Sequence, residues 1–277
     1  MNYRHAFHAG NFADLVKHAA LLRLLDRLQA DAGPLTVIDT HAGPGWYQLT
    51  GTEQARSREA KAGVLRLMTE RDLPSGLDDL QRQVRDINTG AEVEAYAGSP
   101  ALIAERLRAQ DRFVACELRP DDQASLAELL HGGCGDARLA DGFATVVDIA
   151  RQSRDRLLVL IDPPFERADD YVRIVEAAAA VRAAKPDAVF LIWTPLKDLE
   201  TLDAFVRRLE DAGLDAVINE TRLRPLADPT RLNGCVLAAI GAPDGFTSDL
   251  EAISGWVALK LGEPGGAAKV WLAGGDA

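Results

Sequence analysis

The Asp-Pro-Pro-Phe string at residues 162–165 carries the clearest chemistry in the sequence, and it directly follows five apolar residues at 157–161. The string offers the carboxylate of Asp162, the main-chain carbonyl of Pro163 and the flat apolar face of Phe165. Two hydrogen-bond acceptors beside an aromatic ring suit a planar amine, because the ring can stack on a base while the acceptors hold its exocyclic NH2 group. Asp162, Pro163 and Phe165 are therefore the candidate catalytic residues.

The apolar run at 157–161 predicts a strand that is buried on both faces and positions this string. Proline lacks an N–H group and has a restricted φ, so the pair Pro163-Pro164 cannot continue a central strand and forms a stiff turn beyond its carboxyl end. Open α/β sheets bind ligands at that edge. The structural alternative is a buried strand followed by an ordinary Pro-Pro loop with a core phenylalanine.

Acidic residues also stand at the ends of three earlier strand-like runs, at Asp39, Glu117 and Asp141. The loop after Asp39, residues 41–45, contains two glycines, which let a backbone approach a ligand closely. Its spacing is not the G-x-G-x-x-G of dinucleotide sites, which favours S-adenosylmethionine over NAD. Glu117 can accept hydrogen bonds from ribose hydroxyls, and Asp141 with Gly142 is placed to meet the adenine edge. Each acid alone could equally be a solvated strand end.

Strand-like and helical patterns alternate along the chain, which predicts an α/β fold with a doubly wound, mostly parallel sheet. The strand-like runs lie at 35–40, 112–117, 137–139, 157–161, 188–194, 215–221 and 235–240. An amphipathic helix over 11–29, with Asn11 as its N-cap, precedes them. Residues 51–90 are charged and helical without a strand pattern, so we expect an inserted helical subdomain there, within a single domain spanning residues 1–277.

Composition limits the partners that this chain can have. A net charge of −11 over 277 residues argues against wide, non-specific nucleic-acid binding, so any such contact is expected to begin at the less acidic, histidine-containing N-terminus. No apolar run could span a bilayer, and Cys116, Cys134 and Cys235 lack C-x-x-C spacing, so we expect a cytoplasmic protein with buried thiols and no membrane partner. No Cys/His/carboxylate motif accompanies the histidines, so no metal is expected.

Short strings spread in order over the first two-thirds of the chain resemble those of known enzymes. The strings are Tyr3-Arg4-His5, Phe7-His8-Ala9-Gly10-Asn11, Ala13-Asp14, Lys17-His18, Asp39-Thr40-His41-Ala42-Gly43, Tyr47-Gln48-Leu49, Gly98-Ser99-Pro100, Glu117-Leu118, Ala140-Asp141-Gly142-Phe143 and Ile161-Asp162-Pro163-Pro164. The last resembles the Asp/Asn-Pro-Pro-aromatic signature of S-adenosylmethionine-dependent methyltransferases that act on exocyclic amino nitrogens. Together they resemble the ribosomal large-subunit RNA methyltransferase J (RlmJ) family, which makes N6-methyladenosine in 23S rRNA.

This resemblance implies a Rossmann-like class I methyltransferase fold with a small inserted helical subdomain. It also implies a set of residues that line the cofactor pocket: Lys17, His18, His41, Ser99, Glu117, Asp141 and Asp162. Tyr3 and His5 match an N-terminal tail over the site, and with Phe165 they are expected to contact the substrate. The chain departs from the family at Pro44 and Trp46, which lie in the glycine loop. It also has Phe165 where the family frequently has Tyr, so the tyrosine hydroxyl is missing here.

We therefore expect methylation of the N6 amino group of an adenosine in 23S rRNA, with Asp162 and the Pro163 carbonyl holding the amine and Phe165 stacking on the base. A monomer acting on protein-free RNA or an early assembly intermediate is expected. Four alternatives stay open. The motif also resembles rRNA guanine-N2 methyltransferases, and Asn-Pro-Pro-Tyr variants act on protein glutamine. The third alternative is a catalytically idle RNA-binding protein on this fold, and the intact Asp-Pro-Pro-Phe motif argues against it. The fourth is an NAD-dependent oxidoreductase, which the missing G-x-G-x-x-G spacing disfavours.

Overall fold

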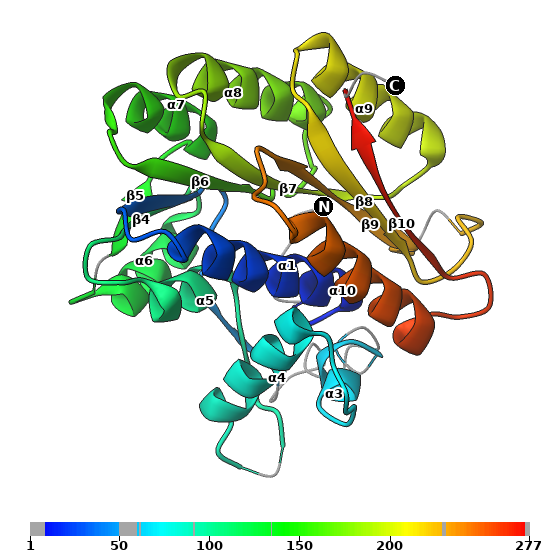
Figure 1. Ribbon diagram of the computed structural model, residues 1–277. Coiled ribbons are helices and arrows are strands. Elements are labelled where there is room, and N and C mark those ends of the chain that lie inside the picture. Colours follow the sequence, from blue (N-terminus) through cyan, green and yellow to red (C-terminus); the bar gives the residue numbers. More distant parts are fainter. Residues whose placement is uncertain are drawn as a thin grey trace.

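The computed structural model describes residues 9–49, 60, 62–90, 92–133, 135–228 and 231–274. In these ranges an eight-stranded sheet runs in the order β10-β8-β9-β7-β6-β1-β4-β5, and helices cover both of its faces (Figure 1). Its strands are β1 (Leu35–Asp39), β4 (Arg112–Glu117), β5 (Gly135–Leu139), β6 (Arg156–Ile161), β7 (Val189–Pro195), β8 (Ala216–Arg222), β9 (Gly234–Ile240) and β10 (Ala267–Ala273).

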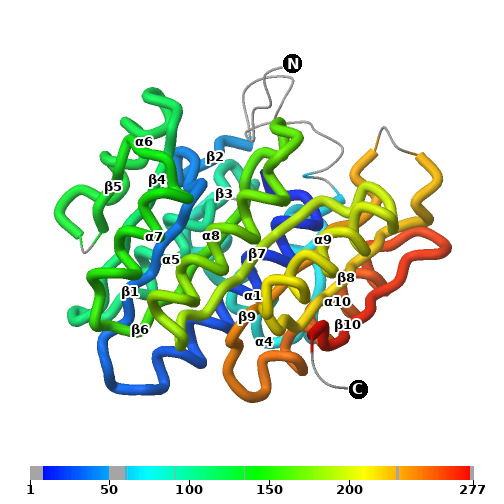
Figure 2. Tube along the Cα trace, turned by 90° about the horizontal axis from the view of Figure 1, so that it is seen from above, coloured from blue at the N-terminus to red at the C-terminus, as the bar shows by residue number. Residues whose placement is uncertain are grey.

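Two helical layers enclose this sheet. One face carries α7 (Gly142–Gln152), α8 (Asp170–Ala184) and α9 (Leu199–Asp211), which lie side by side when seen from above (Figure 2). The other face carries α1 (Phe12–Gln29), α5 (Ser99–Arg106), α6 (Pro120–Leu130) and α10 (Phe246–Leu261). The expected α/β architecture is therefore confirmed.

The sheet is mostly parallel, as expected. β5, β4, β1, β6 and β7 pair in parallel, so their carboxyl ends meet at one edge. β9 runs antiparallel between β7 and β8, and β10 pairs antiparallel with β8. The strand that carries the Asp-Pro-Pro-Phe string is buried on both faces, because Leu158 and Leu160 enter the core beneath α1 while Leu157, Val159 and Ile161 enter the core beneath α7 and α8.

Helix α1 is a buried helix rather than a surface one. Asn11 caps it, since its side chain accepts hydrogen bonds from the backbone N–H groups of Ala13 and Asp14. It packs against α5, α10, β9 and α4 (Ser75–Ile87), so almost its whole circumference is covered. Three of its buried side chains are polar: Asp14, Lys17 and His18. Burial on this scale requires partners for them.

A two-stranded ribbon, β2 (Trp46–Gln48) and β3 (Ala95–Ala97), brackets the segment that contains α4 and the short helix α3 (Val64–Leu67). α4 approaches α1 so closely that a Cβ on Gly76 would lie 2.7 Å from the carbonyl oxygen of Ala19. The helices agree with the expected helical character of 51–90. Residues 50–59 and 61 lie outside the described ranges. The inserted subdomain at 51–90 and the single domain over 1–277 therefore stay predictions.

Cys116 and Cys235 are buried free thiols, as expected, whereas Cys134 lies outside the described residues. Burial raises the pKa of Cys235 to about 12. Among the described helices, not one combines the length and the apolar character needed to cross a membrane.

Candidate active site

Four neighbouring strand ends bring the acids predicted from the sequence to one edge of the sheet. β6 leads into Asp162, β1 ends at Asp39, β4 ends at Glu117 and β5 leads into Asp141. Because these strands are parallel and lie in the order β6-β1-β4-β5, the four carboxylates form a row along that edge. The sequence-based expectation of a shared site is thus supported by the topology.

Lys17, on helix α1, binds Asp162, the first acid of this row. Its Nζ lies 2.5 Å from Oδ2 of Asp162 and 3.1 Å from Oδ1 of Asp14. The side chains of Lys17, Asp14 and Asp162 are only 5%, 4% and 15% exposed. Burial lowers the pKa of Lys17, but the two carboxylates raise it by more, so its pKa stays well above the ordinary value. Lys17 is therefore a permanent buried cation that anchors Asp162.

Asp39 is fully buried beside the start of α5. Its Oδ2 accepts a 2.7 Å hydrogen bond from the Ser99 hydroxyl, and its Oδ1 accepts one of 3.2 Å from the His41 backbone N–H. Burial raises the pKa of Asp39 to about 6, and the bonds from Ser99 and His41 oppose that rise. Asp39 thus connects Ser99 and His41, two of the residues predicted to line the cofactor pocket.

Glu117 supports the glycine loop. Its Oε2 accepts a 3.0 Å hydrogen bond from the Gly43 N–H, while Oε1 accepts bonds from the N–H groups of Leu118 and Arg119 at 2.7 and 2.8 Å. Gly43 has a φ of +65°, a conformation that favours glycine, and a Cβ there would lie 2.7 Å from the Tyr47 hydroxyl. Glu117 therefore holds the loop backbone close to the end of β4.

Asp141 is held by both of its oxygens. Oδ1 caps α7 by accepting from the N–H groups of Phe143 and Ala144 at 2.9 and 3.3 Å, and Oδ2 accepts a 2.6 Å bond from Arg173 on α8. Burial raises the pKa of Asp141, but the Arg173 bond and the capping amides lower it by more, so its pKa lies below the ordinary value. The carboxylate is consequently ionised and fixed in direction.

Two neighbours complete this end of the row. Gly142 has no room for a side chain, because a Cβ would collide with the backbone of Thr40. His41 packs edge-on against Phe143, with ring centroids 4.9 Å apart, and its Nδ1 lies 2.8 Å from the Thr40 hydroxyl oxygen. Burial lowers the pKa of His41 to about 4, so the imidazole is neutral at pH 7.

His18, the neighbour of Lys17, faces a different partner. Its Nδ1 lies 2.8 Å from the Tyr96 hydroxyl, and the two rings stack with centroids 5.5 Å apart. Tyr96 is fully buried on β3. The structure therefore links His18 to the β2–β3 ribbon, and its expected contact with a cofactor stays a prediction.

The strand β6 ends at Ile161, directly before the turn expected from the two prolines. Pro163 is buried, while Phe165 is half-buried and adopts a φ of +52°, which is unusual for a residue with a side chain. The Phe165 ring contacts Tyr171 and Trp193, with centroid distances of 5.0 and 5.9 Å. Phe165 is thus part of an aromatic cluster and not a lone surface ring.

Tyr3 and His5 lie outside the described residues, so their expected contact with substrate has no structural account. In the described ranges, no group of three or more His, Cys, Asp or Glu side chains is placed to hold a metal ion. The sequence reasoning missed Arg173 as the partner of Asp141, Asp14 as the second partner of Lys17, and Tyr96. Of these, only Asp14 had a local signal, since it stands three residues before Lys17 on one helix.

A doubly wound sheet with a row of acids and an Asp-Pro-Pro-Phe turn at one edge is the arrangement expected of a Rossmann-like methyltransferase. A family model described as "Ribosomal RNA large subunit methyltransferase D, RlmJ" matches residues 32–273. Ribosomal RNA large subunit methyltransferase J of Haemophilus influenzae is 31% identical over 268 residues, and that of Escherichia coli K12 is 29% identical over 263 residues; each match covers 94% of both chains.

A crystal structure of protein LPL1258 from Legionella pneumophila superimposes with a TM-score of 0.89 at 28% identity, covering 96% of this chain and 98% of that one. The chain therefore belongs to the RlmJ family of ribosomal RNA large-subunit methyltransferases. The family resemblance and the enzyme class expected from the sequence are confirmed, while the roles of individual site residues stay predictions.

Proposed function

We propose that this chain transfers a methyl group from S-adenosylmethionine to the exocyclic N6 amino group of an adenosine in 23S rRNA. The observation that carries the proposal is the turn after β6, which combines the acceptors of Asp162 and Pro163 with the ring of Phe165, and which Lys17 anchors from α1. The names of the two bacterial relatives support a substrate in large-subunit ribosomal RNA.

The row of acids and the glycine loop suit S-adenosylmethionine, a cation with ribose hydroxyls and an adenine amine. A side chain at Gly43 would collide with the Tyr47 hydroxyl, so the loop keeps a bare backbone there, and the acids supply the acceptors that such a ligand needs. We assign Glu117 to the ribose hydroxyls, and Asp141 with Gly142 to the adenine edge. The remaining proposed cofactor residues are Lys17, His18, His41, Ser99 and Asp162.

In the proposed reaction, the target base is unstacked from its neighbours and placed against Phe165. Lys17 engages Oδ2 of Asp162, which leaves Oδ1 to accept one N6 hydrogen while the Pro163 carbonyl accepts the other. The amino lone pair is conjugated into the ring, so a fork that holds both hydrogens favours a pyramidal nitrogen with its lone pair out of the ring plane. The bound cofactor supplies an electrophilic methyl group on sulfur. Orientation and fixed dipoles provide the acceleration.

The wider assignments are proposals as well. We infer that Tyr3 and His5 contact the RNA, and that the substrate is protein-free 23S rRNA or an early assembly intermediate. An acidic chain suits a small exposed RNA element better than a long duplex. We also propose a cytoplasmic monomer that uses no metal and no membrane partner.

The test is transfer of labelled methyl from S-adenosylmethionine to protein-free 23S rRNA, followed by nucleoside analysis. N6-methyladenosine is the expected product. N2-methylguanosine would replace the proposed base by guanine, whereas tight cofactor binding without transfer would contradict the proposed substrate. A protein that binds no S-adenosylmethionine in calorimetry would contradict the proposal as a whole.

A further inference from the structure

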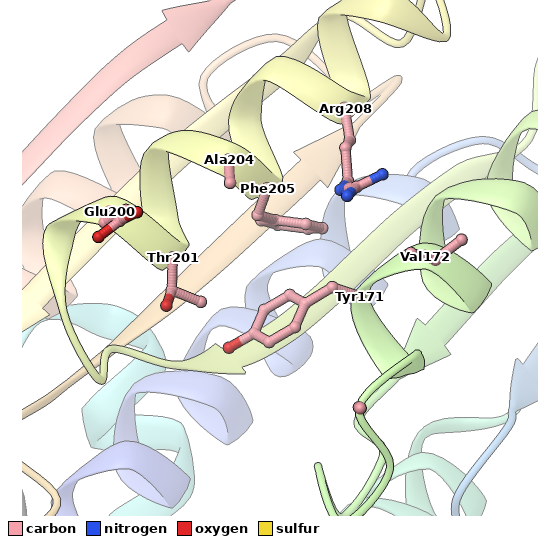
Figure 3. A pocket seen from close by; sticks show the side chains of 8 residues that line it. Tyr171, Val172, Glu200, Thr201, Ala204, Phe205 and Arg208 are labelled. Carbon is pink, nitrogen blue, oxygen red and sulfur yellow. The ribbon is translucent and has the colours of Figure 1, made fainter.

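A pocket of about 290 Å³ lies between α8 and α9, outside the row of acids (Figure 3). Tyr171 and Phe205 supply its aromatic surface, and Thr201 and Ala204 belong to the α9 side. Its volume is at the lower limit of small-molecule sites, which run from about 300 to 1,000 Å³. The pocket therefore fits a single ring system and not a peptide or a large cofactor.

Tyr171 links this pocket to the turn after β6. The ring of Tyr171 contacts both Phe165 and Phe205 in tilted arrangements, with centroid distances of 5.0 and 5.7 Å. α8 begins directly after the turn and α9 directly after β7, so their first turns lie at the same edge of the sheet as Asp162. One aromatic cluster thus separates the proposed target base from the pocket.

The two ends of the pocket carry opposite charges. Figure 3 shows Glu200 and Arg208 at opposite ends, with Tyr171 and Phe205 between them. Within the described residues, neither Glu200 nor Arg208 has an ion-pair partner, whereas the neighbouring Arg207 is paired with Asp203 at 2.9 Å. An unpaired guanidinium suits a phosphate, and an unpaired carboxylate accepts from an amino or imino group of a base.

We propose that this pocket binds the base of a nucleotide next to the target in the single-stranded part of the RNA. The inference rests on the proposed function, because it takes the base at Phe165 as its starting point. The neighbouring base stacks on Tyr171, its N–H edge faces Glu200, and the phosphate lies towards Arg208. Stacking on an aromatic side chain tolerates any base, so the pocket supports binding and the unstacked state more than sequence discrimination.

Two matched pairs of variants test this inference. Ala204→Trp fills the pocket from an exposed position of α9, and Ala212→Trp makes the same change at the exposed C-cap of the same helix, outside the pocket. Arg208→Gln removes the pocket cation, and Arg207→Gln removes a neighbouring charge that is 71% exposed. The readouts are the affinity for protein-free 23S rRNA at one salt concentration, the KM and kcat of methyl transfer, and the affinity for S-adenosylmethionine.

We expect Ala204→Trp to weaken RNA affinity about fivefold or more, the lower limit for loss of one base stack. Arg208→Gln should weaken it about two- to fivefold. KM should rise in parallel, and kcat and cofactor affinity should stay unchanged. Equal RNA affinities within each pair would overturn the inference even if the wild type methylates adenosine. A pocket-dependent affinity in a protein that transfers no methyl would support the inference and contradict the proposed function instead.

Discussion

The buried cation of the site gives the sharpest stability prediction: Lys17→Met should destabilise the protein by about 3–5 kcal/mol, the usual cost of removing one partner from a buried ion pair. At an effective dielectric constant of about 20, the contacts of Nζ at 2.5 Å to Asp162 and 3.1 Å to Asp14 correspond to attractions of roughly 7 and 5 kcal/mol. Burial of the ammonium group offsets several kcal/mol of this. The variant leaves two carboxylates facing each other without their shared cation.

The assay is chemical denaturation of Lys17→Met and of the double variant Lys17→Met/Asp162→Asn, followed by circular dichroism. The double variant should recover part of the loss, because it also removes one of the two uncompensated anions. Arg207→Met is the control: Arg207 is 71% exposed and pairs with the similarly exposed Asp203, and its loss should cost under about 1 kcal/mol. A Lys17→Met protein with wild-type free energy of unfolding would refute the reasoning.

Three further substitutions probe the row of acids and the turn. The pKa of Asp39 is raised to about 6, so ionisation of its buried carboxyl destabilises the folded protein increasingly as pH rises from about 4 to 6. Thermal melts should show the melting temperature of Asp39→Asn rising relative to that of the wild type over this range. A difference that does not change with pH would contradict the assignment. Phe165→Gly tolerates the positive φ but removes the ring, so methyl transfer should fall about tenfold with cofactor affinity unchanged, while Phe165→Tyr should stay active. Arg173→Met frees the Asp141 carboxylate, and calorimetry should show S-adenosylmethionine binding weakened by about tenfold; unchanged affinity would remove Asp141 from the cofactor site.

Some parts of the fold and site could be predicted because their signals are local. The run at 157–161 and the following Pro-Pro pair define a buried strand and its end without reference to the rest of the chain. Asn11 and the apolar positions after it likewise define α1. Since parallel strands end at one edge, the shared edge of the four acids followed from the strand-like runs that precede them.

Other features depend on tertiary contacts. Lys17 on a helix face is ordinarily solvated, and it is buried here because α4, α5, α10 and the sheet surround α1. Arg173 reaches Asp141 from a helix that is far along the sequence, so no spacing rule predicts the pair. The ribbon strands at Trp46–Gln48 and Ala95–Ala97 are too short to show an alternating pattern. The antiparallel direction of β9 is also set by pairing rather than by its own apolar run.

The most direct test of the central claim is methyl transfer by Asp162→Ala to protein-free 23S rRNA, measured together with its affinity for S-adenosylmethionine. Asp169→Ala is the control, because it removes an exposed acid of the same loop. Asp162→Ala should fold, since Lys17 keeps Asp14 as a partner, and it should retain much of its affinity for the cofactor while transfer falls about 100-fold or more. Transfer by Asp162→Ala at the wild-type rate would contradict the account.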